Sequence, residues 1–273
     1  MPLSLVVSLE PQEEAELPAN LGRALHAALL RLVDEASPAL ASALHDDDGP
    51  RPFTVSNLWG AHRAGKGSVR VSKGTACWAR FTSLDGELSG LLRDAFLGGR
   101  IEDLELDGTP FGVTGATADA GENAWAGDVG YGELSQTYLL AEEEPAPGVA
   151  LEFATPTTFR ARGMNVPLPT PELVFGSLLR NWNAFAPVAL SEEVVRYAAE
   201  CVAVARYRLQ TRVLDFGVAR QVGFLGRCRF VALKRDNYWL SLINLLADFA
   251  LYGGVGYKTT MGMGQTRRVH GRL

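Results

Sequence analysis

The sequence predicts an α+β protein built from two tandem ferredoxin-like (RRM-like) domains. Three observations predict this fold. Strand-like alternation and helical apolar periodicity follow one another in the order βαββαβ, and this order occurs twice within the 273 residues. A proline-broken acidic segment, residues 142–148, lies between the two copies. Each copy is expected to form a four-stranded antiparallel sheet with two helices on one face.

The first copy is predicted to occupy residues 1–145. Apolar residues alternate with others over 3–9, which indicates a strand. Asn20 is the expected N-cap of a helix over 21–36, whose apolar face is predicted to reach Ala36. A second, short helix is expected directly after it. The remaining predicted elements are strands at 52–58 and 75–82, a helix at 88–96, and closing strands at 101–106 and in the run after it.

The second copy is predicted to occupy residues 149–273. A stretch rich in Gly, Ala and Asp, residues 115–132, is expected to be a loop before it. The apolar run 238–255 carries Asn244 and Asp248, which favours a buried core helix over a membrane span. The predicted elements are strands at 151–155, 204–216, 222–233 and 265–269, and helices at 171–185 and 238–252.

Cysteine and histidine usage argues against a disulfide framework and against a metal site. The three cysteines are an odd number and lie far apart, and no two of the four histidines have the spacing of metal ligands. The start of the chain shows no secretory signal pattern. We therefore expect a cytoplasmic protein without a metal or cofactor. The three cysteines are Cys77, Cys201 and Cys228, and the four histidines are His26, His45, His62 and His270.

The charge is distributed unevenly along the chain. The formal net charge is −5, yet residues 206–273 hold 12 Lys/Arg against 3 Asp/Glu. A basic C-terminal quarter on an acidic chain indicates a local surface that binds a polyanion. A solvated charged face is the alternative that charge alone leaves open.

A glycine-rich loop is predicted near the C-terminus, between the last helix and the last strand. Glycine lets the backbone approach a ligand closely, so that N–H groups can face phosphate oxygens. A P-loop is excluded because Tyr257 precedes Lys258 and no helix follows, and Thr259 breaks the dinucleotide fingerprint. A flexible connection is the alternative. The five glycines are Gly253, Gly254, Gly256, Gly262 and Gly264.

His45 is the candidate proton-transfer residue. Ser37 and Pro38 begin a short helix that ends at His45, because the acidic Gly-Pro turn after it cannot continue a helix. An imidazole with an ordinary pKa of about 6.5 can accept or donate a proton near neutrality. Arg51 offers a guanidinium fork suited to phosphate. RNA cleavage by the 2′-hydroxyl needs a base, an acid and a cation, but no metal. A histidine that merely interacts with the helix dipole is the alternative.

Together these features resemble the CRISPR repeat-RNA processing endoribonucleases of the RAMP superfamily. The resemblance covers most of the chain. It rests on Leu44-His45 followed by residues 49–56 (GPRPFTVS), on residues 153–159 (FATPTTF), on residues 223–227 (GFLGR) and above all on the glycine-rich loop beside the C-terminus.

The resemblance implies an enzyme that cuts CRISPR precursor RNA once per repeat, without metal. The implied products carry a 2′,3′-cyclic phosphate and a 5′-hydroxyl. His45 matches the family's general base or acid, and Arg51 matches a position that is often basic. Some members carry a tyrosine where this chain has Leu30. His26, one turn away, is the candidate substitute, and a solvated helix histidine is the alternative.

The resemblance also implies the partners. Precursor and mature guide RNA are expected to bind the glycine loop, whose five glycines are named above, and basic residues near it. CRISPR effector subunits and a second copy of the chain (a homodimer) stay open as protein partners, and no membrane is expected. A non-catalytic RAMP subunit that binds guide RNA is the alternative function. The basic candidates are Lys258 and some of Arg227, Arg229, Lys234, Arg235, Arg267 and Arg268.

Overall fold

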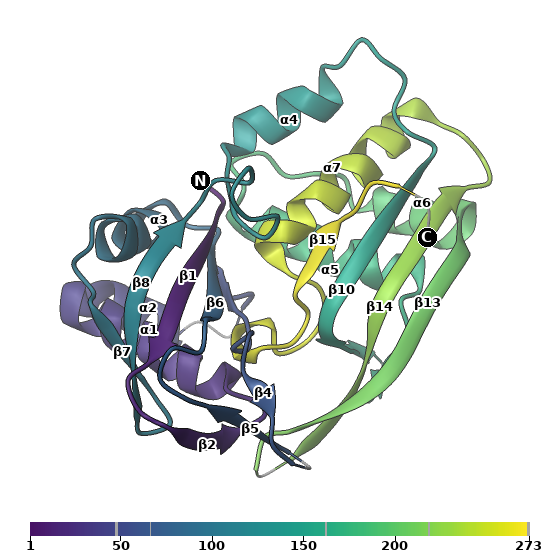
Figure 1. Cartoon of the computed structure of the whole chain (residues 1–273). Coiled ribbons are helices and arrows are strands. Elements are labelled where there is room, and N and C mark those ends of the chain that lie inside the picture. Colours follow the sequence, from purple (N-terminus) through teal and green to yellow (C-terminus); the bar gives the residue numbers. More distant parts are fainter. Residues whose placement is uncertain (47–48, 66, 162, 218, 272–273) are drawn as a thin grey trace. The chain divides into compact units, whose positions relative to one another are not determined.

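The computed structural model describes residues 1–46, 49–65, 67–161, 163–217 and 219–271 (Figure 1). The side chains of His45 and Asp46 lie outside this description. The described chain forms two compact units. The first consists of Met1–Asp128 with Asp215–Arg220 and Lys258–Met263, and the second consists of Val129–Leu214, Gln221–Tyr257 and Gly264–Leu273.

The main sheet of the first unit has the strand order β3-β6-β1-β8-β7, and β9 also pairs with β1. All of these pairs are antiparallel. Strand β1 therefore lies between β6, the third predicted strand, and β8, the run after 101–106 that was also predicted as a closing strand, as in a ferredoxin-like sheet. The bounds are β1 (Leu3–Pro11), α1 (Gly22–Ala36), α2 (Pro38–Asp46), β3 (Phe53–Val55), β6 (Cys77–Ser83), α3 (Gly86–Leu92), β7 (Asp103–Leu106), β8 (Thr109–Thr117) and β9 (Gly127–Asp128).

A small second sheet also belongs to this unit. Strand β5 pairs antiparallel with both β2 and β4. A π-helical turn, η1, continues α3 directly. None of the three strands of this sheet was among the predicted elements. The bounds are β2 (Ala15–Pro18), β4 (His62–Arg63), β5 (Ser68–Val71) and η1 (Arg93–Leu97).

Helix α1 packs its apolar face into the core of the first unit. Leu25 and Val33 are fully buried, whereas Ala36 is exposed, so the predicted face was one turn too long. The N-cap is Leu21, one residue after the predicted Asn20, but Asn20 Oδ1 does accept a hydrogen bond from the Gly22 N–H at 3.3 Å. The Leu21 N–H donates to Asn57 Oδ1 at 2.7 Å. Two asparagines therefore satisfy N–H groups at the start of this helix, and the local sequence could reveal only the first of them.

The sheet of the second unit has the order β13-β14-β10-β15. Here too the first strand of the copy lies between its third and its fourth, so the prediction of an α+β fold with two tandem ferredoxin-like sheets is confirmed. The bounds are α4 (Tyr131–Leu139), β10 (Gly148–Thr157), β11 (Phe159–Ala161), β12 (Met164–Val166), α5 (Pro171–Phe185), α6 (Glu193–Cys201), β13 (Val202–Asp215), β14 (Arg220–Ala232), α7 (Asn237–Gly253), the 3-10 turn η2 (Thr259–Met261) and β15 (Thr266–Arg268).

Helices α5 and α7 cover one face of the second sheet. The ring of Phe175 on α5 lies 5.5 Å from that of Phe230 on β14, and Trp182 lies 5.2 Å from Phe249 on α7. Alternate residues of β14 point away from these helices, and Arg227 and Arg229 are exposed there. This sheet face therefore presents cations on a surface that the two helices do not cover.

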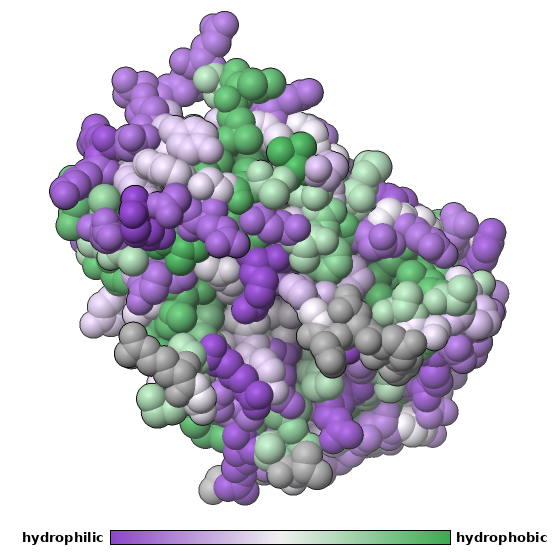
Figure 2. All heavy atoms as spheres, turned by 180° about the vertical axis from the view of Figure 1, so that it is seen from behind, coloured by the Kyte–Doolittle hydropathy of each residue, from purple (hydrophilic) through white to green (hydrophobic). Residues whose placement is uncertain are grey.

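The predicted core helix is present as α7, which is capped by Asp236 through the Trp239 N–H. No helix among the described residues is long and apolar enough to cross a membrane. Hydrophilic side chains dominate the face shown in Figure 2, interrupted by smaller hydrophobic areas.

Two helices of the second unit, α4 and α6, are absent from the prediction. Part of the stretch expected to be a loop forms β9 and the first turn of α4. Helix α4 buries only Tyr131 and Leu134, and the Tyr131 ring contacts Trp182 at 5.2 Å. Such a short helix depends on tertiary packing because its own propensity cannot sustain it.

Candidate active site and nucleic-acid interface

His26 is fixed against the glycine-rich loop within the first unit. Its Nδ1 lies 3.0 Å from the carbonyl oxygen of Thr260, and its ring stacks on Phe53 at 5.6 Å. A carbonyl oxygen only accepts hydrogen bonds, so this contact assigns a proton to Nδ1. The half-buried imidazole is therefore oriented by a residue 234 positions further along the chain.

Two glycines allow α1 and the loop to approach each other. A Cβ on Gly22 would lie 2.3 Å from the carbonyl oxygen of Met261. Gly262 has φ +91°, and its N–H donates to Val55 O at 3.0 Å. Only glycine fits such a backbone contact without displacing one of the partners. Glycine is thus needed at position 262 of the loop because its φ is positive and the backbone of α1 lies close to it.

Arg23 lies beside the candidate site and was not among the predicted residues. It lies one turn before His26 on α1, and its guanidinium donates to Phe216 O at 3.0 Å. The Nζ atom of Lys258 lies 4.4 Å from the centroid of the Phe216 ring. The spacing of Arg23 and His26 on one helix could have suggested a shared face. The contact with residue 216 has no signal in the sequence.

The backbone amides of the loop hold the loop itself. Gly254 donates to Ala250 O at 3.1 Å, and Gly256 donates to Ser177 Oγ at 2.9 Å. Gly264 donates to Pro156 O at 3.2 Å. These amides therefore fix the loop conformation, where we had expected them to face phosphate oxygens. Contact between this loop and RNA stays a prediction.

His45 lies in the last turn of α2, but its side chain is outside the described residues. Arg51 follows the turn, and its guanidinium donates a hydrogen bond to the carbonyl oxygen of Leu44. The arginine therefore lies against the backbone that carries His45, as the sequence spacing suggested. The role of His45 stays a prediction.

Glu152 bridges two of the predicted RNA-binding arginines. Its carboxylate lies 3.0 Å from Arg227 and 2.8 Å from Arg267. Burial raises the pKa of Glu152, but the hydrogen bonds and charges of the two arginines outweigh it and lower the pKa below the ordinary value of 4.5. Part of the basic charge on this face is thus neutralised, while Arg229 is exposed beside it.

Arg268 lies apart from the other candidate arginines. Its guanidinium pairs with Asp248 at 3.3 Å and with Asn244 Oδ1 at 2.7 Å, and it donates to the hydroxyl of Tyr138 at 3.2 Å. Only 13% of its side chain is exposed. Because this network ties β15 to α4 and α7, Arg268 has a structural role on the helical side of the sheet.

A small pocket of about 220 Å³ borders the first part of the loop in the second unit. The Arg160 guanidinium lies 4.3 Å above the Tyr257 ring, and Arg180 and Ser177 also line the pocket. A stacked arginine and a second arginine are suited to a phosphate or a base. Neither arginine was among the predicted RNA contacts, because both lie before the basic C-terminal quarter.

The structure thus distributes the predicted site residues between the two units. His26, Lys258 and Gly262 belong to the first unit, together with Arg51. Gly253 packs in the second, where an added Cβ would lie 2.8 Å from the Phe249 ring. The other candidates of the second unit are Gly254, Gly256, Gly264, Arg227, Arg229, Arg267 and Arg268.

The two sheets, each with its first strand between its third strand and a closing strand, define a protein of the tandem ferredoxin-like class. The model of the CRISPR Cas6 N-terminal domain matches residues 1–136, and that of the CRISPR-associated endoribonuclease Cas6 matches residues 151–266. The chain belongs to the CRISPR-associated endoribonuclease Cas6 family. The resemblance drawn from the sequence is confirmed.

Individual relatives agree with this assignment. A Cas6 endoribonuclease of Streptococcus thermophilus is 28% identical over 128 residues, which cover 46% of this chain and 52% of that protein. A Mycobacterium tuberculosis Cas6 is 32% identical over 118 residues, covering 43% of this chain and 37% of the relative. The matched stretch therefore spans about half or less of these curated proteins.

Solved structures match over almost the whole chain. A Cas6 product complex superimposes with a TM-score of 0.80 and 26% identity, covering 98% of this chain and 99% of that one. Thermus thermophilus Cas6 gives a TM-score of 0.74 at 25% identity, with 98% of each chain covered. A Cas6 substrate mimic complex gives 0.71 at 29% identity, covering 98% of this chain and 99% of the other.

Proposed function

We propose that this protein is an endoribonuclease that cleaves CRISPR precursor RNA within each repeat. The observation that carries the proposal is that the first unit combines segments from distant parts of the chain. Residues 258–263, from the far end of the sequence, pack there with α1, which carries His26, and the same unit includes His45 and Arg51. Groups able to transfer protons and groups able to bind phosphate therefore share one folded unit. The family assignment supports the same activity.

The proposed reaction proceeds by attack of the 2′-hydroxyl on the adjacent phosphorus. A base removes the 2′-hydroxyl proton, the new P–O bond forms, the bond to the 5′-oxygen breaks, and an acid protonates that oxygen. The products are a 2′,3′-cyclic phosphate and a 5′-hydroxyl. His45 is the proposed proton-transfer residue and His26 its proposed partner. Arg51 stabilises the charged intermediate, and no step requires a metal ion.

The proposed substrate is CRISPR repeat RNA, both as precursor and as mature guide. The solved product complex and substrate mimic complex of similar Cas6 proteins support this choice. Within this chain, Lys258 and the exposed Arg229 are the best-placed cations. Arg227 and Arg267 contribute less charge because each pairs with Glu152.

The same proposal includes two domains. Residues 1–145 carry the catalytic histidine, and residues 149–273 carry the glycine-rich RNA-binding loop. The proposed site of action is the cytoplasm. Residues 140–147 connect α4 to β10 and include three consecutive glutamates, residues 142–144. Limited proteolysis tests the boundary. Cleavage within 142–148 that leaves two protected fragments would support it, and first cleavage inside α5 or α7 would contradict it.

Cleavage of repeat RNA in the presence of a chelator tests the activity. We expect one discrete cut per repeat and a 2′,3′-cyclic phosphate end. His45→Ala should slow cleavage by about 10²–10⁴-fold, the range of general acid–base catalysis, while RNA binding stays within several-fold. His62→Ala, on the exposed strand β4, is the matched control and should cleave normally. Wild-type binding without any cut would instead identify a non-catalytic subunit.

A further inference from the structure

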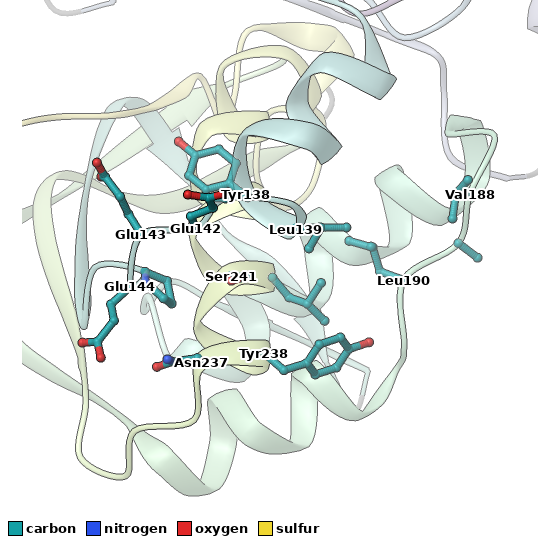
Figure 3. Close-up of a pocket in the computed structure, with 14 residues that line it drawn as sticks. Tyr138, Leu139, Glu142, Glu143, Glu144, Val188, Leu190, Asn237, Tyr238 and Ser241 are labelled. Carbon is teal, nitrogen blue, oxygen red and sulfur yellow. The ribbon is translucent and has the colours of Figure 1, made fainter.

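A second and larger pocket, of about 420 Å³, opens among the helices of the second unit (Figure 3). Its walls are the C-terminal end of α4, residues 141–145 with their three glutamates, residues 188–190 and the first turns of α7. None of the predicted catalytic or RNA-binding residues lines it. The pocket therefore calls for an explanation separate from RNA cleavage.

One side of this pocket is apolar. Leu190 and Leu242 are buried, while Val188 and Tyr238 line the pocket and are 64% and 57% exposed. Leu139, at the end of α4, adds a third exposed apolar side chain. Exposed apolar side chains gathered around a concave surface, unlike scattered ones, are typical of an interaction site.

The opposite side is acidic. Glu142, Glu143 and Glu144 are consecutive and exposed, and Figure 3 shows them across the pocket from Val188 and Leu190. Every charged residue among the described lining residues is a glutamate. This charge repels a phosphate backbone and favours a cationic partner.

Hydrogen bonds hold the walls of the pocket in place. The Tyr138 hydroxyl donates to Asp248. Asn183 donates to Leu190 O at 3.0 Å and accepts from the Leu190 N–H at 2.8 Å. Asn244 donates to Ala146 O at 2.9 Å, just after residues 141–145. A preformed pocket binds its ligand with less loss of conformational entropy than one that must be assembled.

The pocket and the exposed arginines belong to opposite sides of one sheet. Helix α7, which lines the pocket, packs on β10 and β15. Arg227 and Arg229 project from the sheet face that the helices leave uncovered. We propose that the pocket docks a segment of a partner protein that combines lysine or arginine with apolar anchor residues, and that docking leaves the RNA-facing surface free.

Binding of a defined peptide to the full chain tests this proposal. The probe is a fluorescein-labelled peptide of about twelve residues with lysine and leucine at helical spacing. Fluorescence anisotropy measures its binding. We expect saturable binding that weakens at least about tenfold in the combined variant Glu142→Gln/Glu143→Gln/Glu144→Gln. Tyr238→Ala should weaken it as well, because it removes the apolar anchor site without changing charge.

Two controls separate specific docking from general attraction. The combined variant Glu13→Gln/Glu14→Gln/Glu122→Gln removes the same charge from exposed positions of the first unit and should bind the peptide normally. A lysine-only peptide of equal charge should bind more weakly than the lysine–leucine probe. Repeat-RNA cleavage, if the proposed function holds, should be equal in all of these variants, whereas peptide binding does not depend on that activity.

Three outcomes would overturn the proposal. Equal loss of peptide binding in the pocket variant and in the control variant would show nonspecific charge attraction. Loss of RNA binding in the pocket variant would make the pocket part of the RNA surface. Self-association of the wild-type chain that the pocket substitutions abolish, measured by sedimentation, would identify a second copy as the occupant.

Discussion

His26 Nδ1 lies 3.0 Å from the carbonyl oxygen of Thr260, across 234 positions of sequence. This contact joins the first helix of the chain to the turn η2 of the glycine-rich loop within the first unit. It fixes which nitrogen of the ring carries a proton and in which direction the ring points. An imidazole held in this way keeps one tautomer and one orientation, which the proposed role of His26 in proton transfer requires.

Substitution of His26 separates orientation of the loop from proton transfer. Asparagine can still donate a hydrogen bond to Thr260 O but does not titrate. We therefore expect His26→Asn to keep RNA binding within several-fold and to lose cleavage by about 10²-fold or more. The pH dependence of the single-turnover rate should also lose one ionisation. Wild-type rates in His26→Asn would show that the residue only positions the loop.

Gly22→Ala should weaken the attachment of the loop to α1. The new Cβ would lie 2.3 Å from Met261 O, a backbone atom that cannot move without displacing the loop. Overpacking of this kind lowers the free energy of unfolding by about 1–3 kcal/mol, which urea denaturation measures. Gly90→Ala in α3 meets no atom within 4 Å. This control should be neutral or stabilising by up to about 1 kcal/mol, and an equal loss in both variants would contradict the prediction.

The salt dependence of RNA binding should report Arg229 directly. Each phosphate contact contributes about 0.7–0.9 to the slope of log K against log salt. Arg229→Ala should therefore reduce the magnitude of the slope by about 1. Arg196→Ala is the control, since this α6 arginine pairs with Glu193 at 2.7 Å. An unchanged slope in Arg229→Ala would remove this residue from the RNA surface.

Glu152 should make the stability of the protein depend on pH. Its pKa is lower in the folded protein than the ordinary value of 4.5 because the hydrogen bonds and charges of Arg227 and Arg267 outweigh the effect of burial. The stabilisation is therefore fully present above the ordinary pKa and is lost as the pH falls through the lowered value. We expect wild type to be more stable than Glu152→Gln at neutral pH, with the difference vanishing in acid. Urea unfolding at a series of pH values measures this difference in the free energy of unfolding. A difference that stays constant as the pH falls would contradict the prediction.

Removing the same carboxylate should also affect RNA binding, with the opposite sign. In Glu152→Gln the two arginines lose their negative partner, so the sheet face becomes more positive. We expect repeat RNA to bind more tightly at neutral pH, with a steeper salt dependence. Weaker binding, measured by filter retention, would indicate that Glu152 is needed to orient Arg227 and Arg267 toward RNA.

Local patterns predicted several elements well. The helix predicted at 171–185 has the bounds Pro171–Phe185, because proline at the first helical position and a long apolar face mark it clearly. Helices α4 and α6 were missed, since each is short and is stabilised mainly by packing in the second unit. Asn20 does accept a hydrogen bond from the Gly22 N–H, but no signal in the sequence indicated that Asn57 accepts one from the Leu21 N–H beside it.

The candidate site shows the same division. The glycine-rich motif and the order βαββαβ repeated twice were sufficient to indicate the fold and the family, because both are patterns of neighbouring residues. Only the tertiary structure decided that residues 258–263 pack with α1, that Arg268 joins a network with Asp248, and that the N–H groups of Gly254, Gly256 and Gly264 donate within the protein. These outcomes depend on which donors and acceptors the folded chain brings within about 3 Å of each other, and sequence spacing does not encode that distance.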